Sequence, residues 1–428
     1  PTRQLPLHVQ AAEGLTMAAL VNDQMRAAWA IPQFRRLMYS RLVSNIGNGI
    51  SPVALAFGVL GLKGANGTSL TIVNGSLMVS LALFMLVGGV AADRFGRCRL
   101  VGASDIIGGC VAAVSAVLLI TGHASVPFLA VNAFLFGALN AVWLPAFRGI
   151  TPQLVPADLL QSANSWNGVF ANVFMMLGAG FAGLIVTLLG AGWGVMIDAV
   201  SFLVAGILVW SLRSTDAPNR GNGPEPSLIG EMREGWNEFS SRRWLVAGLA
   251  GTGLYWMVLM GFLNVAGPVQ AKLRLGGANA WGMSVFGWGL GGLIGVLIAA
   301  RVRPRRPLRT SWVLMSMCSL WFFSTAAAMP LLIVMMGAVA AGIANDFMFQ
   351  FSLTEMQTRV PGELLSRVGS YTEFAPSIAA PIGLALTGPL VDSVGATEVC
   401  VAVGVLSLVA CAVPLSFRSL RNLERSTP

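Results

Sequence analysis

Long hydrophobic runs separated by short polar segments are the main pattern along this chain. A helix that crosses about 30 Å of hydrocarbon needs about 20 apolar residues, because each residue rises about 1.5 Å. The pattern therefore predicts an all-α membrane protein with twelve transmembrane helices. These helices are expected near residues 37–62, 69–91, 100–122, 125–147, 160–189, 191–212, 244–270, 279–300, 309–329, 330–353, 366–391 and 395–417.

The polar segments divide the chain into two halves of six helices. The segment between the halves contains Pro218, Pro224, Pro226 and five acidic residues, which is typical of a linker. The predicted parts are an N-terminal tail (1–36), a first half (37–212), a linker (213–243), a second half (244–417) and a C-terminal tail (418–428).

The composition favours lipid as the solvent, since 55% of the 428 residues are hydrophobic and 11% are charged. Soluble domains carry about 25% charged residues. The net charge of +9 could indicate nucleic-acid binding, but the basic residues follow the membrane topology. With both termini in the cytoplasm, the external loops hold only Lys63, Lys272 and Arg274 among the 27 basic residues. We therefore expect a multi-pass protein of the inner (plasma) membrane with both termini cytoplasmic, and no nucleic-acid partner.

The two halves repeat one another in sequence. A shift of 205 residues aligns 137–191 with 342–396 without a gap. The matched pairs include Gly137/Gly342, Asn140/Asn345, Pro156/Pro361, Gly178/Gly383 and Gly183/Gly388. Because the shift spans six helices, both copies have the same orientation. Such a parallel repeat places a substrate site near the midplane, between the halves.

The loop after the second predicted helix reads Gly89-Val-Ala-Ala-Asp93-Arg94-Phe-Gly96-Arg97. Gly96 permits a tight turn, and Asp93 can accept hydrogen bonds or lie at a helix N-terminus. The loop resembles the cytoplasmic signature of the major facilitator superfamily. The resemblance implies a gating role for Gly89, Asp93, Arg94, Gly96 and Arg97, which would hold the cytoplasmic side closed. A positive-inside anchor is the simpler alternative.

Further segments are similar to one branch of that superfamily, which includes enterobactin exporters and Tap-type multidrug-efflux proteins. They are Arg41 to Gly49, Pro145 to Leu160, Asp198 to Phe202, and Gln357 to Pro361 with Pro381-Ile-Gly383 following. This resemblance covers residues 36–418 and implies export driven by ion exchange.

The chain departs from the family pattern at several positions. Asn48 stands where the branch often has Asp, and the fifth-helix motif appears as Gly178-Ala-Gly-Phe-Ala-Gly183 without its Pro. The buried Arg that many drug antiporters carry in the fourth helix is absent, since Arg148 lies at the cytoplasmic end. The proton route of those antiporters therefore does not carry over intact.

Four acids at membrane depth are candidates for proton coupling: Asp346, Glu373, Asp105 and Asp198. A charged acid near the midplane costs about 2.5–3.5 kcal/mol on insertion scales, so such residues point to function. Asp346 is the first choice and Glu373 the second, because both occur only in the second copy of the repeat. Asp105 could instead be an interfacial cap or ion pair, and Asp198 could hydrogen-bond a neighbouring helix. Arg41 is expected to snorkel or to pair with an acid.

Polar and aromatic residues within the helices are candidates for lining a substrate cavity. The alternative for each is interhelical contact or a place in an interfacial aromatic belt. The candidates are Asn45, Asn48, Asn140, Trp143, Asn164, Trp166, Asn167, Phe170, Trp256, Asn345, Phe347, Gln350 and Tyr371.

Other chemistry is not indicated. Residues Gly287 to Gly292 match GxGxxG by spacing, but they fall inside an apolar helix with no preceding strand. The sequence contains no P-loop motif and no cysteine spacing typical of a metal site. We expect no catalytic activity, no cofactor and no metal.

The hypothesis is a secondary transporter that exports amphiphilic small molecules, such as drugs, antibiotics or siderophore-like compounds, by proton antiport with alternating access. Its partners would be the substrate, protons and the bilayer, and it would work as a monomer. Two alternatives stay open: a proton-coupled nutrient uptake symporter, and a non-transporting membrane sensor.

Overall fold

A computed structural model describes residues 23–212, 228–361 and 364–425. The described part is helical, and its long helices are those that the hydrophobic runs predict. In the first half they are α2 (Pro32–Leu60), α3 (Gly67–Phe95), α4 (Arg97–Ile120), α5 (Val126–Arg148), α7 (Leu160–Leu189) and α8 (Ala191–Trp210), with the short α6 (Thr151–Leu154) and η1 (Ala157–Leu159) before α7.

The second half begins with α10 (Arg243–Gly261), which continues through a π-helical turn, η2 (Phe262–Ala266), into α11 (Gly267–Arg274). The rest are α12 (Ala278–Arg301), α13 (Pro307–Met315), α14 (Cys318–Ala326), α15 (Leu331–Arg359), α16 (Leu365–Val394), α17 (Ala396–Ser416) and α18 (Arg418–Arg421).

Eleven described helices are long and apolar enough to cross a membrane. The remaining predicted span, near 309–329, is divided into α13 and α14. The backbone N–H groups of Ser316 and Met317 bond to carbonyls three residues back, which interrupts the α-helical pattern. Neither piece is long enough to span by itself, although together they fill the predicted position.

Many large apolar side chains lie on the outside of the bundle. Leu83, Leu188, Leu332 and Met336 each expose 63–70% of their surface. Such exposure would be costly in water and is favourable in lipid.

The repeat appears as equivalent helix contacts in the two halves. α2 packs on α7 and α8 in the first half, as α10 packs on α16 and α17 in the second. Gly178 of α7 lies against the carbonyl oxygen of Ile46, and its repeat partner Gly383 of α16 lies against that of Met257. A side chain at either glycine would collide with backbone, which explains the retained Gly.

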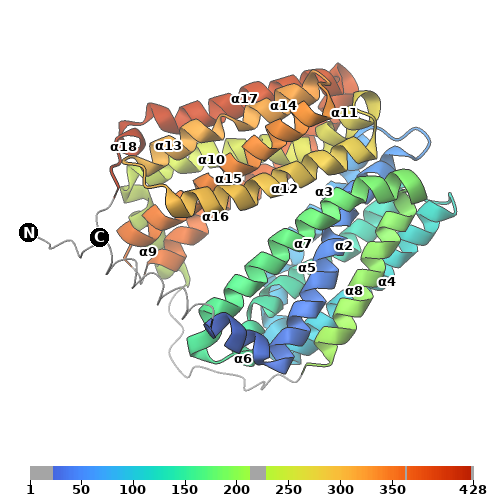
Figure 1. Cartoon of the computed structure of the whole chain (residues 1–428), viewed down its shortest axis with the longest axis horizontal. Coiled ribbons are helices and arrows are strands. Elements are labelled where there is room, and N and C mark those ends of the chain that lie inside the picture. The colour runs from blue at the N-terminus through green and yellow to red at the C-terminus, as the bar shows by residue number, and fades with distance from the viewer. Residues whose placement is uncertain (1–22, 213–227, 362–363, 426–428) are drawn as a thin grey trace, which may run out of the picture.

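The halves meet at one end of the molecule and diverge toward the other (Figure 1). We name the meeting side the closed end; it carries the turns at Asn66, Gly190 and Gly395. The opposite side, the open end, carries the turns at Gly96 and Val360. The most extensive contacts between the halves are those of α7 with α12 and of α3 with α16, and smaller ones join α2 to α11 and α12.

Hydrogen bonds between the halves fall in the closed end, as far as the described residues go. Asp392 accepts from the backbone of Gly67 and Thr68, the Thr71 hydroxyl donates to the Leu384 carbonyl, and Lys272 donates to the Leu60 carbonyl. The structure is therefore closed at one end only.

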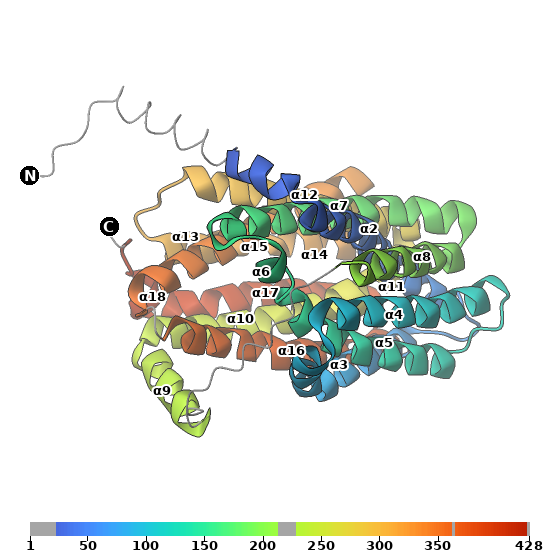
Figure 2. The same ribbon diagram turned by 90° about the horizontal axis from the view of Figure 1, so that it is seen from below.

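The predicted linker contains a helix, α9 (Leu228–Ser241), which lies outside the main bundle (Figure 2). Its Trp236 packs on Tyr371 of α16, with ring centroids 5.4 Å apart, and its Glu234 pairs with Arg367. The predicted N-terminal tail holds a similar element, since residues 23–30 are helical and Trp29 packs on Trp166 of α7 at 5.1 Å. Trp166 and Tyr371 are repeat partners, so each half has a helix anchored at the same place.

Candidate functional site

Asp346 is half-buried on α15 and faces α12. A Cβ added to Gly292 would lie 2.5 Å from its Oδ2 atom, so a side chain at this position would force the carboxylate to move. The neighbouring Asn345 side chain lies within hydrogen-bonding range of the same group. α15 and α12 thus hold the acid at membrane depth with a polar partner.

Glu373 is exposed on α16, and its carboxylate makes no ion pair within the described part of the chain. It lines a cavity of about 270 Å³ inside the second half. An exposed acid in this place can meet a cationic ligand or a proton from the open end.

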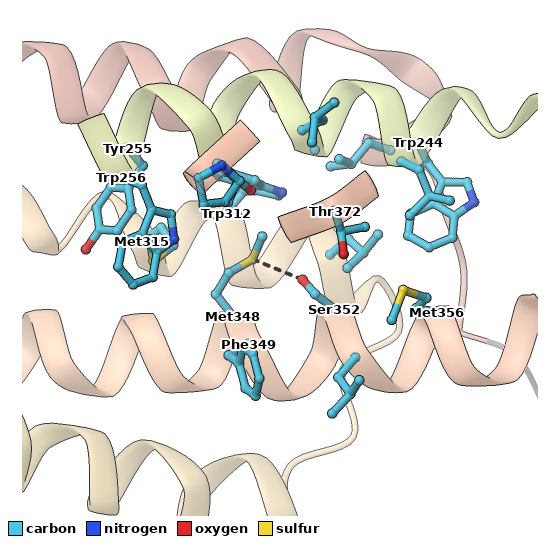
Figure 3. A pocket seen from close by; sticks show the side chains of 18 of the residues that line it. Trp244, Tyr255, Trp256, Trp312, Met315, Met348, Phe349, Ser352, Met356 and Thr372 are labelled. Carbon is cyan, nitrogen blue, oxygen red and sulfur yellow. Dashed lines mark hydrogen bonds between the residues drawn. The ribbon is translucent and has the colours of Figure 1, made fainter. Parts of the chain in front are cut away.

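This cavity, which we call the C-half cavity, lies between α10, α13, α15 and α16 and is bounded by α18 at the open end (Figure 3). Aromatic and methionine side chains dominate its wall, and Glu373 is the charged member among the described lining residues. The lining residues discussed below are Gly248, Thr252, Trp256, Trp312, Asn345, Met348, Ser352, Thr372 and Glu373. Apolar walls with a few polar groups are typical of small-molecule sites.

A buried polar cluster occupies the first half. Arg41 of α2 is 8% exposed and donates to Oδ1 of Asn45 at 3.0 Å. Its guanidinium carbon lies 4.9 Å from the ring centroid of Trp143 and 4.7 Å from that of Phe147, two rings that stack on each other. These contacts combine cation–π attraction with a charged hydrogen bond.

Asp105 of α4 is the acid of this cluster. It is 2% exposed and interacts electrostatically with Arg41. Its Oδ2, the Nδ2 of Asn45 and the Nε1 of Trp143 have no hydrogen-bond partner among the described residues. Asp105 lies inside α4 and not at its N-terminus, and it interacts with Arg41 electrostatically without a direct ion-pair contact.

Asp198 is also buried, on α8 against Gly47 of α2. A Cβ at Gly47 would meet Oδ1 of Asp198 at 2.5 Å and the hydroxyl of Ser201 at 2.1 Å. This close packing fits the helix-contact alternative for Asp198.

The other cavity candidates are divided by the fold. Trp256 and Asn345 line the C-half cavity, and Asn45 and Trp143 belong to the Arg41 cluster. Trp166 and Phe170 contact Trp29 of the N-terminal helix (23–30), and Tyr371 contacts Trp236 of α9. Phe347 is 2% exposed and packs on Phe351. Asn140 donates to the Phe136 carbonyl and Asn167 to the Thr151 hydroxyl, while Asn48, Asn164 and Gln350 show no side-chain hydrogen bond among the described contacts.

The predicted gating loop lies at the open end, between α3 and α4. Gly96 has a φ of +82°, the left-handed region that suits glycine, and Arg97 donates from Nη1 to the Gly149 carbonyl at 3.0 Å. This bond ties the loop to the end of α5. Gly89, Asp93 and Arg94 belong to a stretch whose side chains lie outside the described residues.

Sequence reasoning missed the cavity wall contributed by Trp312, Met348 and Ser352. It could have been found by comparing the two repeat copies position by position, because Met348 and Ser352 stand where the first half has Trp143 and Phe147.

Comparison with known proteins agrees with this architecture. The family model of the Major Facilitator Superfamily matches residues 37–383. The multidrug efflux pump Tap of Mycobacterium tuberculosis is 28% identical over 405 residues, covering 91% of this chain and 94% of the pump. Macrolide efflux protein A of Streptococcus pyogenes is 25% identical, with 92% and 97% covered.

Among solved structures, the nucleoside transporter NupG is similar with a TM-score of 0.68 at 13% identity, covering 90% of this chain and 98% of that one. A bacterial homologue of the lysosomal transporter Spinster, crystallised in an inward-facing and unoccupied conformation, gives a TM-score of 0.66 at 14% identity, with 93% and 99% covered. At these identities the likeness concerns the fold.

Proposed function

Because this chain belongs to the Major Facilitator Superfamily, we propose that it is a secondary transporter that exports amphiphilic small molecules in exchange for protons. The observation that carries the proposal is the one-ended contact between the halves, which leaves the C-half cavity on the open side. Rocking of the halves would then expose the substrate to each side of the membrane in turn. The export direction rests on the similarity to Tap and to macrolide efflux protein A.

The open end is proposed to face the cytoplasm. It carries the basic segments 301–306 and 418–421, whereas the closed end has few basic residues, among them Lys63, Lys272 and Arg274. Cytoplasmic loops are enriched in Lys and Arg. The present conformation would therefore receive substrate from inside the cell, and a monomer contains both halves that the cycle needs.

Asp346 remains the preferred proton carrier. Its half-buried position on α15, opposite α12, lets its environment change when α12 moves against α7 at the boundary of the halves. An acid whose exposure changes during the cycle can bind a proton on one side and release it on the other. Glu373 is the second choice.

The test is accumulation of ethidium or a macrolide in inside-out vesicles with an acidic lumen, comparing wild type with Asp346→Asn. We expect gradient-driven accumulation in wild type, and loss of accumulation with retained binding in the variant. Asp158→Asn, which removes an exposed acid at the open end, is the charge-matched control and should transport normally.

The other outcomes are equally informative. Unchanged accumulation in Asp346→Asn removes this residue from coupling and moves the role to Glu373. If wild type accumulates neither compound, export of amphiphilic drugs is the wrong function for this chain.

A further inference from the structure

The C-half cavity has a counterpart in the first half that is filled. The correspondence of α2 with α10 follows from matched contacts: Ser40 donates to the Ala205 carbonyl, and Gly251 lies against the carbonyl of Ala410, the repeat partner of Ala205. Ser40 thus corresponds to Gly251. The contacts of Ile46 with Gly178 and of Met257 with Gly383 give the same offset of 211 residues.

This offset makes Thr252 the counterpart of Arg41. The later helices correspond at the offset of 205 residues, so Met348 is the counterpart of Trp143 and Ser352 that of Phe147. In the first half, Arg41 lies over the stacked rings of Trp143 and Phe147. In the second half, the three smaller counterparts all line the cavity.

The cavity is therefore the space that an arginine and two aromatic rings occupy in the other copy of the repeat. An unfilled space lowers stability, since its walls lose packing contacts. The first half fills this space with the side chains of Arg41, Trp143 and Phe147, whereas the second half leaves it empty. This difference is expected if a ligand fills the space in the second half.

We propose that the C-half cavity binds an organic cation that carries a planar, hydrogen-bond-donating group of the guanidinium type next to an aromatic ring. This ligand occupies the space that Arg41, Trp143 and Phe147 fill in the first half. The inference names the substrate class and site of the proposed function and so rests on it.

The cavity wall matches both parts of such a ligand. Trp256 and Trp312 offer ring faces to a cation or an aromatic group, and Met348 adapts to rings of different shape. Glu373 supplies the negative charge, and no lining residue is basic.

Size limits what the cavity holds. Drug-sized sites measure about 300–1,000 Å³, and this cavity of about 270 Å³ is slightly smaller. It fits one ring with its cationic group, so the rest of a larger amphiphile would extend past Glu373 and Thr372 toward the open end.

Binding to purified protein tests the proposal without a gradient or a membrane potential. The probes are phenethylguanidinium and its uncharged isostere phenethylurea, measured by calorimetric titration in detergent. We expect wild type to bind the guanidinium at least about tenfold more tightly than the urea, since a hydrogen bond to a charged group is worth more than a neutral one. Glu373→Gln should remove most of this preference while leaving urea binding unchanged.

Ser352→Phe restores the ring that the first half has at Phe147 and should abolish binding of both probes. Its control is Thr354→Phe, the same added ring two residues further along α15 on an exposed position outside the cavity. Thermal unfolding of both variants separates a filled cavity from a damaged fold: Ser352→Phe should unfold at or above the wild-type temperature, because it fills a void.

Equal affinity for the two probes, or unchanged binding in Ser352→Phe, would overturn the proposal. The result also separates it from the transport proposal. Guanidinium binding with no vesicle accumulation leaves the site standing and removes the export function, whereas gradient-driven export with probe binding insensitive to Ser352→Phe places the substrate elsewhere.

Discussion

The carboxylate of Asp392, at the end of α16, caps the amino end of α3 at Thr68. Its Oδ2 accepts from the backbone N–H of Thr68 at 2.9 Å and from its hydroxyl at 2.5 Å, and Oδ1 accepts from the N–H of Gly67 at 2.8 Å. One side chain of the second half thus satisfies the free amides of a helix in the first. Because all three bonds cross between the halves, Asp392 stabilises the conformation that is closed at this end.

Asp392→Ala should shift the population toward the state that is open at the present closed end. Loss of these partly exposed hydrogen bonds should cost about 1 kcal/mol, which is about a fivefold change in population. The check is the labelling rate of Val391→Cys, a buried residue of α16 that lies against Gly67, by a membrane-impermeant maleimide in a background without the five native cysteines.

Glu398→Ala removes an exposed acid at the same end and serves as the control. A labelling rate that rises equally in both variants would show a general charge effect. It would contradict the stabilising role of the Asp392 hydrogen bonds.

Arg41→Met should destabilise the first half, because it removes the hydrogen bond to Asn45, the two cation–π contacts and the positive charge that favours the buried Asp105 carboxylate. A hydrogen bond from a charged group alone is worth about 1.5–3 kcal/mol. The double variant Arg41→Met/Asp105→Asn should recover part of the loss, since the Asp105→Asn change leaves no charge that the arginine would stabilise. Thermal unfolding of the two single variants and the double variant measures the coupling.

Arg148→Met, at the exposed end of α5, is the matched control and should change the unfolding temperature little. If Arg41→Met and Asp105→Asn act additively, the two residues do not interact electrostatically.

Gly383→Ala should disrupt the contact between α16 and α10. A Cβ there would lie 1.8 Å from the carbonyl oxygen of Met257, so the backbones must separate. We expect a lower yield of monodisperse protein and a lower unfolding temperature. Gly168→Ala, on α7 with no heavy atom within 4 Å of the added Cβ, should be neutral or slightly stabilising. Equal loss in both variants would show that helix flexibility, and not the close contact, is what matters.

Trp236→Ala should release α9 from α16 while leaving the transmembrane bundle intact. The contact of Trp236 with Tyr371 and the pair of Glu234 with Arg367 hold this helix at the open end. Limited proteolysis within residues 213–241 should become faster in this variant, with thermal unfolding unchanged. Trp193→Ala, which shortens an exposed side chain of α8, gives the reference rate, and a cleavage rate equal to it would mean that Trp236 does not anchor α9.

The hydrophobic runs by themselves determined the order and approximate bounds of the eleven spanning helices in the described part of the chain. The thickness of the bilayer sets how many consecutive apolar residues a spanning helix needs, and that number is visible in the local sequence. The starts of α3 and α12 therefore fell within two residues of the prediction. The repeat was equally visible, because glycines such as Gly178 and Gly383 are fixed by backbone contact, which tolerates no side chain. The local break between Met315 and Cys318 left no mark in the hydrophobic pattern.

Tertiary structure alone decided which polar residues meet. Arg41, Asp105 and Trp143 come from α2, α4 and α5, and their interaction depends on how three helices rotate and pack. The same packing left Glu373 exposed in a cavity and Asp198 enclosed. The sequence shows which segments are apolar for long enough to cross a membrane. Burial, the interactions of charged groups and the cavity arise only when side chains far apart in the chain come into contact.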